Sequence, residues 1–110
     1  MTSATIKLFL PRGEALGQRT ANGFVVFHGS TAVLEERPSA ENYPYVMVQR
    51  KQLIAEGVLT EKNDFLVFTR DAEFSSPSAA AAVIHGGSAN GLIAWKTEGG
   101  KSLKQLDEQA

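Results

Sequence analysis

The chain has 110 residues, 43% of them hydrophobic and 21% charged, which is typical of one folded domain and excludes a disordered or fibrous protein. Its 11 basic residues against 12 acidic ones give a formal net charge of −1, so no overall field attracts a polyanion. Because the chain has no cysteine, disulfides, thiolate metal centres and a cysteine nucleophile are excluded.

The chain carries no sign of membrane targeting. Its first ten residues hold an apolar run too short for a signal peptide, and no stretch approaches the about 20 apolar residues of a membrane span. We therefore expect a cytoplasmic protein with no membrane partner, folded as a single accessory-type domain over residues 1–110.

Three strands are predicted in the first third of the chain. Residues 6–10 are apolar with one polar break and stop at a Pro-Arg-Gly sequence, which indicates a first strand. Residues 15–19 and 24–27 flank Asn22-Gly23, a dipeptide typical of tight hairpins, so these two strands are expected to pair. The polar, proline-broken residues 35–40 predict a loop.

Residues 43–58 predict an amphipathic helix. Its apolar positions, which are expected to face the core, include Val46, Leu53 and Ile54. The opposite, solvated side carries Arg50, Lys51 and Gln52. After a hydrophilic turn, the strand-forming residues 65–69 predict a fourth strand.

A second helix is predicted from residue 76 to residue 85. Ser76 has the character of an N-cap, and Pro77 has its φ angle preset for the first helical turn. The alanine run 79–82 implies that another element packs very close to this helix, and Val83 and Ile84 are expected in the core. Gly86 follows and can adopt the left-handed conformation that ends many helices.

Residues 91–95 are predicted as a fifth strand and residues 102–109 as a short C-terminal helix. Because strands and helices do not alternate regularly, we expect an α+β fold. The expected architecture is a mixed, mostly antiparallel sheet of about five strands, with the two main helices packed on one face.

A signature runs through the C-terminal part of the chain. It comprises FSSPSAAA at residues 74–81, then Gly86, Asn90-Gly91, Trp95-Lys96 and GKSL at residues 100–103. This pattern resembles the bacterial family called domain of unknown function four-three-five-seven, and residues 23–26, 29–30 and 53–59 also fit it. The resemblance therefore covers nearly the whole chain.

Members of that family are commonly joined to GIY-YIG endonuclease domains, and they also occur alone. The signature is similar to that of the restriction-enzyme adenine-methylase-associated domain as well. The resemblance thus implies an accessory role in a nucleic-acid or defence setting, beside a nuclease or modification enzyme. Since the accessory domain fills these 110 residues, no room is left for the nuclease's catalytic residues.

The first functional hypothesis is non-catalytic recognition of DNA or RNA. Asn90, Trp95 and Lys96 would stack a base and contact a phosphate, and Arg50 and Lys51 would contribute to a basic patch. The structural interpretation of the same residues is a tight turn at Asn90-Gly91, a tryptophan in the core and a solvated helix face.

The start of the second helix is a candidate anion site. The side chains of Ser76 and Ser78 lie where backbone N–H groups and the positive helix end favour an anion, although simple capping of the helix explains the same residues.

The second functional hypothesis is a protein-interaction module that docks a partner chain or itself, because the charge is nearly neutral and the small-residue helix permits close approach. No cofactor, metal or enzymatic activity is expected. A hydrolytic triad would combine His28 or His85 with Ser30 or Ser88 as the nucleophile, but the sequence lacks a nucleophile-elbow pattern. His85 itself suits the negative end of a helix.

Overall fold

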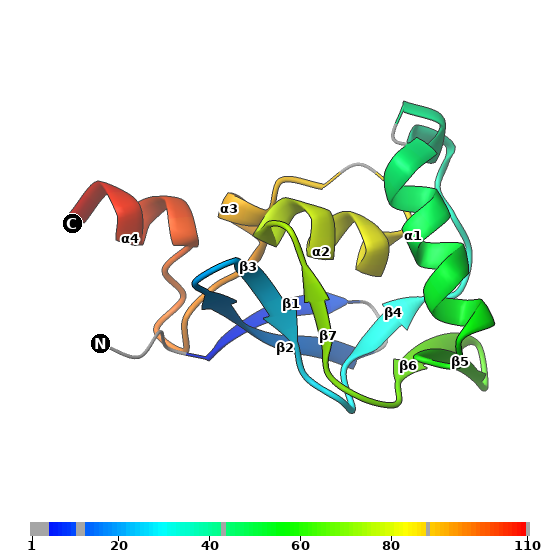
Figure 1. The fold of residues 1–110 in the computed structure, drawn as a ribbon. Helices are drawn as coiled ribbons and strands as arrows, with labels where there is room; N and C mark the ends of the chain where they lie inside the picture. Colours follow the sequence, from blue (N-terminus) through cyan, green and yellow to red (C-terminus); the bar gives the residue numbers. More distant parts are fainter. Residues whose placement is uncertain (1–4, 11–12, 43, 88, 110) are drawn as a thin grey trace.

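The computed structural model describes residues 5–10, 13–42, 44–87 and 89–109, and it has the α+β class that the sequence predicts. Within these residues the strands form two sheets instead of the single sheet expected, and every strand pair is antiparallel. Figure 1 shows the helices gathered on one side of the larger sheet. No helix in the described part of the chain combines the length and apolar character that a membrane span requires.

The larger sheet, sheet A, has the strand order β1-β2-β3-β7. Its strands are β1 (Ile6–Leu10), β2 (Gly13–Thr20), β3 (Gly23–Val26) and β7 (Ala72–Phe74). The first three confirm the predicted strands, and Thr20 opposite Gly23 closes the predicted hairpin. β7 was not predicted, because three residues are too few to display an alternating pattern.

The smaller sheet, sheet B, has the order β4-β6-β5. Its strands are β4 (Thr31–Val33), β6 (Phe65–Phe68) and β5 (Leu59–Lys62). β6 confirms the predicted fourth strand, whereas β4 and β5 were missed. β5 reads Leu-Thr-Glu-Lys and is exposed after its first residue, so only its pairing with β6 reveals it as a strand.

The helices are α1 (Pro44–Ala55), α2 (Pro77–His85), α3 (Gly91–Ala94) and α4 (Leu103–Gln109). A 3-10 helix, η1 (Pro38–Asn42), lies in the segment predicted as a loop. The prediction of a fifth strand over residues 91–95 is wrong, because Asn90 caps a single helical turn there: its side-chain Oδ1 accepts from the backbone N–H of Leu92.

Local signals fixed both ends of α2. The Ser76 hydroxyl oxygen accepts a hydrogen bond from the Ala79 N–H at 3.0 Å, and Pro77 occupies the first turn. Gly86 ends the helix at φ 68°, a left-handed conformation that glycine adopts without strain. The predicted cap, first turn and stop of this helix are confirmed.

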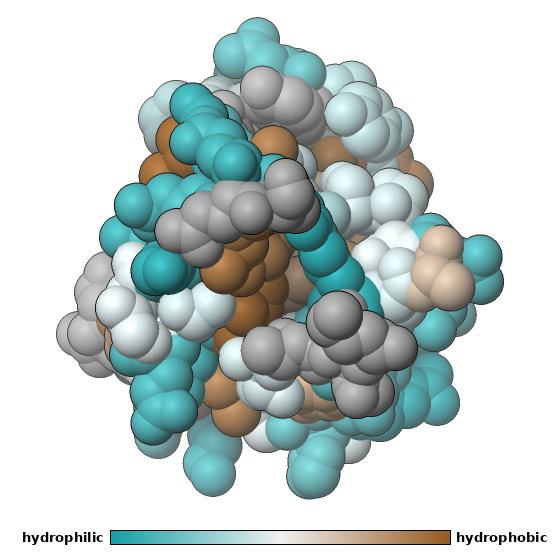
Figure 2. Space-filling view, turned by 90° about the vertical axis from the view of Figure 1, so that its left-hand side faces the viewer, coloured by the Kyte–Doolittle hydropathy of each residue, from teal (hydrophilic) through white to brown (hydrophobic). Residues whose placement is uncertain are grey.

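A reciprocal capping box starts α4. The Gln105 side chain accepts from the Ser102 N–H at 2.8 Å, and the Ser102 hydroxyl accepts from the Gln105 N–H at 3.2 Å. Arg19 of β2 ties the far end of α4 to sheet A through two hydrogen bonds to Asp107, at 2.7 and 3.0 Å. Figure 2 views this end of the molecule, where hydrophobic residues form the floor of a hollow and hydrophilic residues form part of its border.

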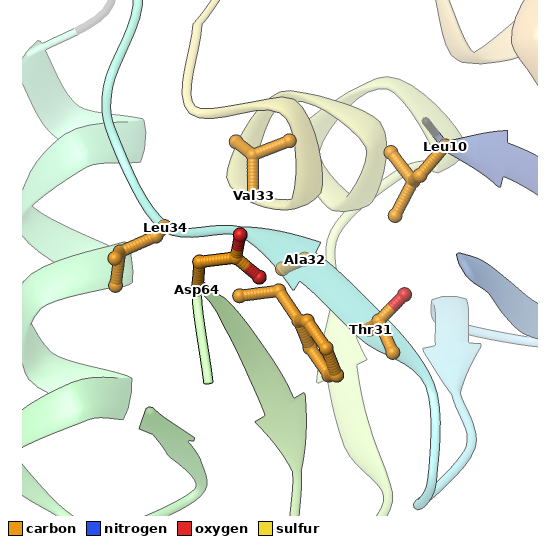
Figure 3. A pocket seen from close by; sticks show the side chains of 7 residues that line it. Leu10, Thr31, Ala32, Val33, Leu34 and Asp64 are labelled. Carbon is orange, nitrogen blue, oxygen red and sulfur yellow. The ribbon is translucent and has the colours of Figure 1, made fainter. Parts of the chain in front are cut away.

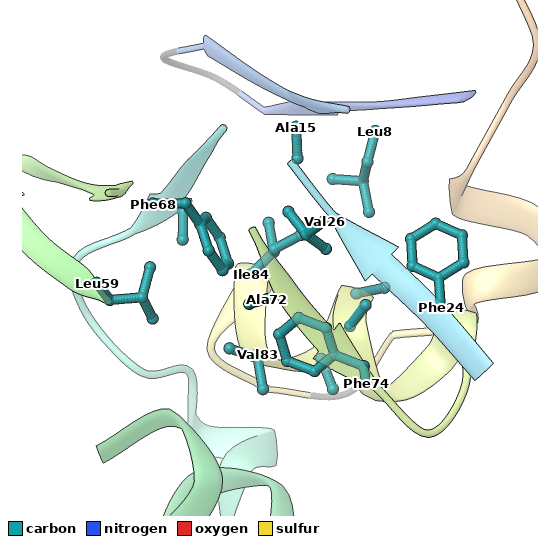
Figure 4. Packing of buried hydrophobic residues seen from close by; sticks show 14 of the residues in the cluster. Leu8, Ala15, Phe24, Val26, Leu59, Phe68, Ala72, Phe74, Val83 and Ile84 are labelled. Atoms are coloured by element: carbon teal, nitrogen blue, oxygen red, sulfur yellow. The ribbon is translucent and has the colours of Figure 1, made fainter. Parts of the chain in front are cut away.

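The core lies between α2 and the inner face of sheet A (Figure 4). Ala80 and Ala81 are fully buried, so the alanine-rich helix does pack closely against its neighbours as predicted. Val83 and Ile84 are also fully buried, and the Phe68 and Phe74 rings meet edge to face.

The predicted core face of α1 is only partly right. Val46 is buried, but Leu53 is half-buried and Ile54 is 43% exposed. The residues that α1 buries are Val46, Met47 and Arg50. The helix therefore turns a narrow stripe inward. Arg50, which was predicted to lie on the solvated side, belongs to that stripe.

Candidate functional site

Trp95 is completely buried. Its ring centroid lies 4.6 Å from that of Phe24, and its indole N–H donates to the Pro77 carbonyl oxygen at 3.0 Å. A side chain without exposed surface cannot stack on a nucleic-acid base, so the stacking hypothesis for Trp95 is wrong. The core interpretation is confirmed.

Asn90-Gly91 and the start of α2 form one interlocked unit, which we call the clasp: Pro77, Ser78, Gly91 and Trp95. The Ser78 hydroxyl accepts from the Gly91 N–H at 3.0 Å, and Trp95 bonds to Pro77. A Cβ atom on Gly91 would lie 2.3 Å from the Pro77 carbonyl carbon, so only glycine fits there. The signature residues of the C-terminal part thus join α2 to α3, and Asn90 caps α3 instead of forming the expected tight turn.

The serines of the predicted anion site already have partners. Ser76 caps α2 and Ser78 belongs to the clasp. A shallow groove of about 120 Å³ runs beside them between α1 and α2 and is lined partly by Tyr45 and Ala82. The capping interpretation is confirmed for Ser76, while anion binding stays a prediction.

Arg50 does not lie on a solvated helix face, because only 2% of the residue is exposed. Its guanidinium donates to the backbone carbonyls of Val83 in α2, Val33 in β4, and Leu34, the last at 3.0 Å. Burial lowers the pKa of Arg50, and the charge of Glu36 acts in the opposite direction. Arg50 therefore joins α1, α2 and β4 and cannot contribute to a surface basic patch.

Lys51 and Lys96, the other predicted cations, are exposed but far apart in the fold. Lys51 lies on α1, and Lys96 follows α3; Figure 1 shows α1 at one end of the molecule and α3 on the far side of α2 from it. The structure therefore does not bring the five predicted nucleic-acid residues into one surface.

A different surface, which we call the outer face, is formed by the side of sheet A that points away from the helices (Figure 1). Strand alternation buries Ile6, Leu8 and Ala15 on the inner side and turns their neighbours outward. Each outward side chain is exposed or half-buried. They are Lys7, Phe9, Glu14, Leu16, Gln18, Val25, Phe27, Glu73 and Lys96.

The strand register sets the order of charges across the outer face. Lys7 lies opposite both Leu16 and Lys96, and Val25 lies opposite Glu73. Because partners in an antiparallel pair project to the same side, lysines stand on the β1 side and Glu73 on the β7 side. The Lys7 ammonium also lies 3.7 Å from a carboxylate oxygen of Glu14. Sequence reasoning missed this surface, although the outward positions of Phe9, Leu16 and Val25 follow from strand alternation alone.

A second concave feature lies between the end of β1 and β4 (Figure 3). It has a volume of about 200 Å³ and is mostly apolar, lined by Leu10, Thr31, Ala32, Val33, Leu34, Asp64 and Phe65. Among the described residues no three histidine, aspartate or glutamate side chains gather as metal ligands. The pocket has an apolar wall and one carboxylate, a lining typical of a packing surface and not of a catalytic site.

The residues weighed for a hydrolytic triad have other contacts. Ser30 is buried and its hydroxyl bonds to the backbone of Leu16, accepting from the N–H at 2.9 Å and donating to the carbonyl at 3.3 Å. His28 is exposed in the turn that follows β3. Ser88 lies outside the described residues.

His85 ends α2 half-buried, and its buried Nδ1 has no hydrogen-bond partner among the described residues. Burial lowers the pKa of His85 below its ordinary value of 6.5, and the nearby charge of Arg37 lowers it further. The favourable helix dipole that the sequence suggested is therefore outweighed by burial and by a neighbouring cation.

The depressed pKa of His85 makes stability depend on pH. Between its folded and unfolded pKa values the unfolded chain binds more protons, so the free energy of unfolding falls as the pH drops below 6.5. Urea denaturation at neutral and at mildly acidic pH should show that acidification lowers the free energy of unfolding more for the wild type than for His85→Gln. Carboxylates titrate in both proteins, so equal losses would contradict the assignment.

Comparisons with known proteins identify one family. A family model described as "Domain of unknown function (DUF4357)" matches residues 8–107. No curated protein and no solved structure matches the chain.

Proposed function

This chain belongs to the family described as Domain of unknown function (DUF4357), and we propose that it is a non-catalytic module that docks a protein partner through the outer face of sheet A. The description of the family assigns no activity, so the proposal rests on the surface of the domain. The resemblance to domains that accompany nucleases and modification enzymes makes such an enzyme a candidate partner.

The apolar content of the outer face carries the proposal. In an antiparallel sheet that covers a core on one side, the other side is ordinarily polar. Here Phe9 is 64% exposed, and Leu16, Val25 and Phe27 are half-buried at positions that alternation turns to solvent. Apolar side chains gathered on an uncovered sheet face are typical of interaction surfaces.

The charges on the outer face favour a protein over a nucleic acid as the partner. Lys7 and Lys96 are offset by Glu14 and Glu73, so the face has no excess of positive charge to bind a phosphate backbone. Nucleic-acid recognition, the first hypothesis from the sequence, is therefore the competing function, and the DNA titration described below tests it.

Site-specific photocrosslinking tests the proposal. A benzophenone amino acid is placed at Phe9 on the outer face or at Val48 on α1, because both residues are 64% exposed and only the first lies on the proposed surface. After irradiation in cells that naturally produce the protein, we expect polypeptide adducts at position 9 and none above background at position 48. Mass spectrometry of the adduct identifies the partner. Equal yields at the two positions would contradict the proposal.

A titration decides between the two kinds of partner. Labelled single-stranded and double-stranded DNA, with and without methylation, is titrated at low salt with the wild type and with Lys96→Glu. Binding at tens of micromolar protein that the substitution weakens would replace protein docking with nucleic-acid recognition on this face. We expect no such binding.

A further inference from the structure

We propose that the outer face docks a second copy of this chain, with the two sheets face to face about a two-fold axis parallel to the strands. This inference rests on the proposed docking function and names its partner. The polarity of charge across the face, with lysines on one side and a glutamate on the other, points to this occupant.

The polarity follows from the strand order. The backbone of Lys96 pairs with that of Lys7 beside β1, so these two lysines stand together on the outer face. Glu73 lies in β7 at the other side of the sheet, opposite Val25 of β3. Between these sides lie the apolar residues Leu16, Val25 and Phe27, together with Glu14 and Gln18 of β2. A surface with opposite charges at its two sides and apolar residues between them is complementary to a rotated copy of itself.

Two simple two-fold arrangements can stack identical sheets. A rotation about an axis parallel to the strands reverses the strand order, so with β2 near the axis β1 of one copy lies over β3 of the other, and the Lys96 segment lies over β7. Lys96 then lies one outward row, two residues or about 7 Å along the strand, from Glu73 of the other copy, and these opposite charges approach each other twice in the dimer. A rotation about an axis across the strands places β1 over β1 and sets Lys96 against Lys96. Because like charges repel, the observed charge order selects the first arrangement.

The size of the face limits the affinity. The four strands of sheet A and the Lys96 bridge, about 4.8 Å apart and about four residues long on average at about 3.3 Å per residue, give a patch of about 24 by 14 Å, or about 340 Å² per copy. A stable interface buries about 800 Å² per partner, so we expect a weak dimer, with dissociation constants of tens of micromolar or above. Leu16 of β2, the middle one of these five segments, would lie near the axis and contact its own counterpart.

Sedimentation equilibrium with charge-reversed variants tests the dimer. At low salt, and over protein concentrations from about 10 µM to about 1 mM, the apparent mass of the wild type should rise from the 11.8 kDa of the monomer towards twice that value. Lys96→Glu alone and Glu73→Lys alone should each associate about tenfold more weakly or worse. An equimolar mixture of the two variants should associate again, because each copy then meets the opposite charge at both sides. The control Lys51→Glu, on α1, should behave as the wild type does.

The outcomes separate the dimer from the docking function. A chain that stays monomeric over the whole concentration range overturns the dimer, and so does a mixture of the two variants that fails to associate when the wild type does. If adducts at position 9 then contain a different polypeptide, docking on the outer face stands without self-association. Both substituted residues are exposed, and near-ultraviolet circular dichroism confirms that each variant is folded.

Discussion

Replacing Arg50 with methionine is expected to lower the free energy of unfolding by about 3 to 5 kcal/mol, a large part of the about 5 to 15 kcal/mol of an ordinary domain. Arg50 donates to the carbonyls of Val83, Val33 and Leu34 from a nearly buried position. Methionine fills similar space but leaves these acceptors without their donor, and the Val83 carbonyl lies near the end of α2, where intrahelical partners run out.

Urea denaturation followed by the single tryptophan measures this effect, and Lys51→Met is the matched control. Lys51 is the next residue of the same helix and is exposed, so its replacement should change stability by no more than about 0.5 kcal/mol. Arg50→Lys should fall between the two, because an ammonium group cannot span three carbonyls as a planar guanidinium does. Similarly small effects of Arg50→Met and Lys51→Met would show that the hydrogen bonds of Arg50 do not stabilise the fold.

The elements that the sequence predicted are those decided by neighbouring residues. Ser76, Pro77 and Gly86 define α2 through a cap, a preset φ angle and a left-handed stop, all of which act within a few residues. The hairpin at Asn22-Gly23 is local in the same way. Contacts between distant parts of the chain were not predictable from such signals.

Arg50 and α3 demonstrate the limit. A cation on a helix is ordinarily solvated, and only the approach of the residues around Val33 and Val83, 17 and 33 positions away, supplies acceptors that make burial favourable. The segment from Gly91 to Ala94 has strand-like composition, but the clasp with Pro77 and Ser78 fixes it as a helical turn. In both cases tertiary contacts outweigh the local preference.

The candidate surface was hidden for a related reason. Outward apolar residues in β1, β2 and β3 could be read from alternation, but the lysines of the outer face come together only because the segment after α3 pairs with β1. Sequence motifs drew attention to Trp95 instead, and its role is to complete the core beside Phe24. Most of the recognisable signature therefore maintains the fold, and the apolar residues of the proposed interaction surface lie in the less distinctive first third of the chain.

Replacing Gly91 with alanine is expected to destabilise the domain by about 3 kcal/mol or more, because the new methyl group would overlap backbone atoms that cannot move independently. The added Cβ would lie 2.3 Å from the Pro77 carbonyl carbon and 2.4 Å from the Ser78 nitrogen. To relieve the overlap, α3 must move away from α2, which breaks the bonds from Gly91 to Ser78 and from Trp95 to Pro77.

Two measurements check this result. Thermal denaturation gives the loss of stability, and the emission of Trp95 should shift to longer wavelength as its ring gains contact with water. Gly99→Ala is the control, since the nearest atom to its added Cβ is the Thr97 hydroxyl oxygen at 3.9 Å, and it should stay within about 0.5 kcal/mol of the wild type. If Gly91→Ala were equally mild and left the emission unchanged, α2 and α3 would not be held together by the clasp, and the signature residues would need another explanation.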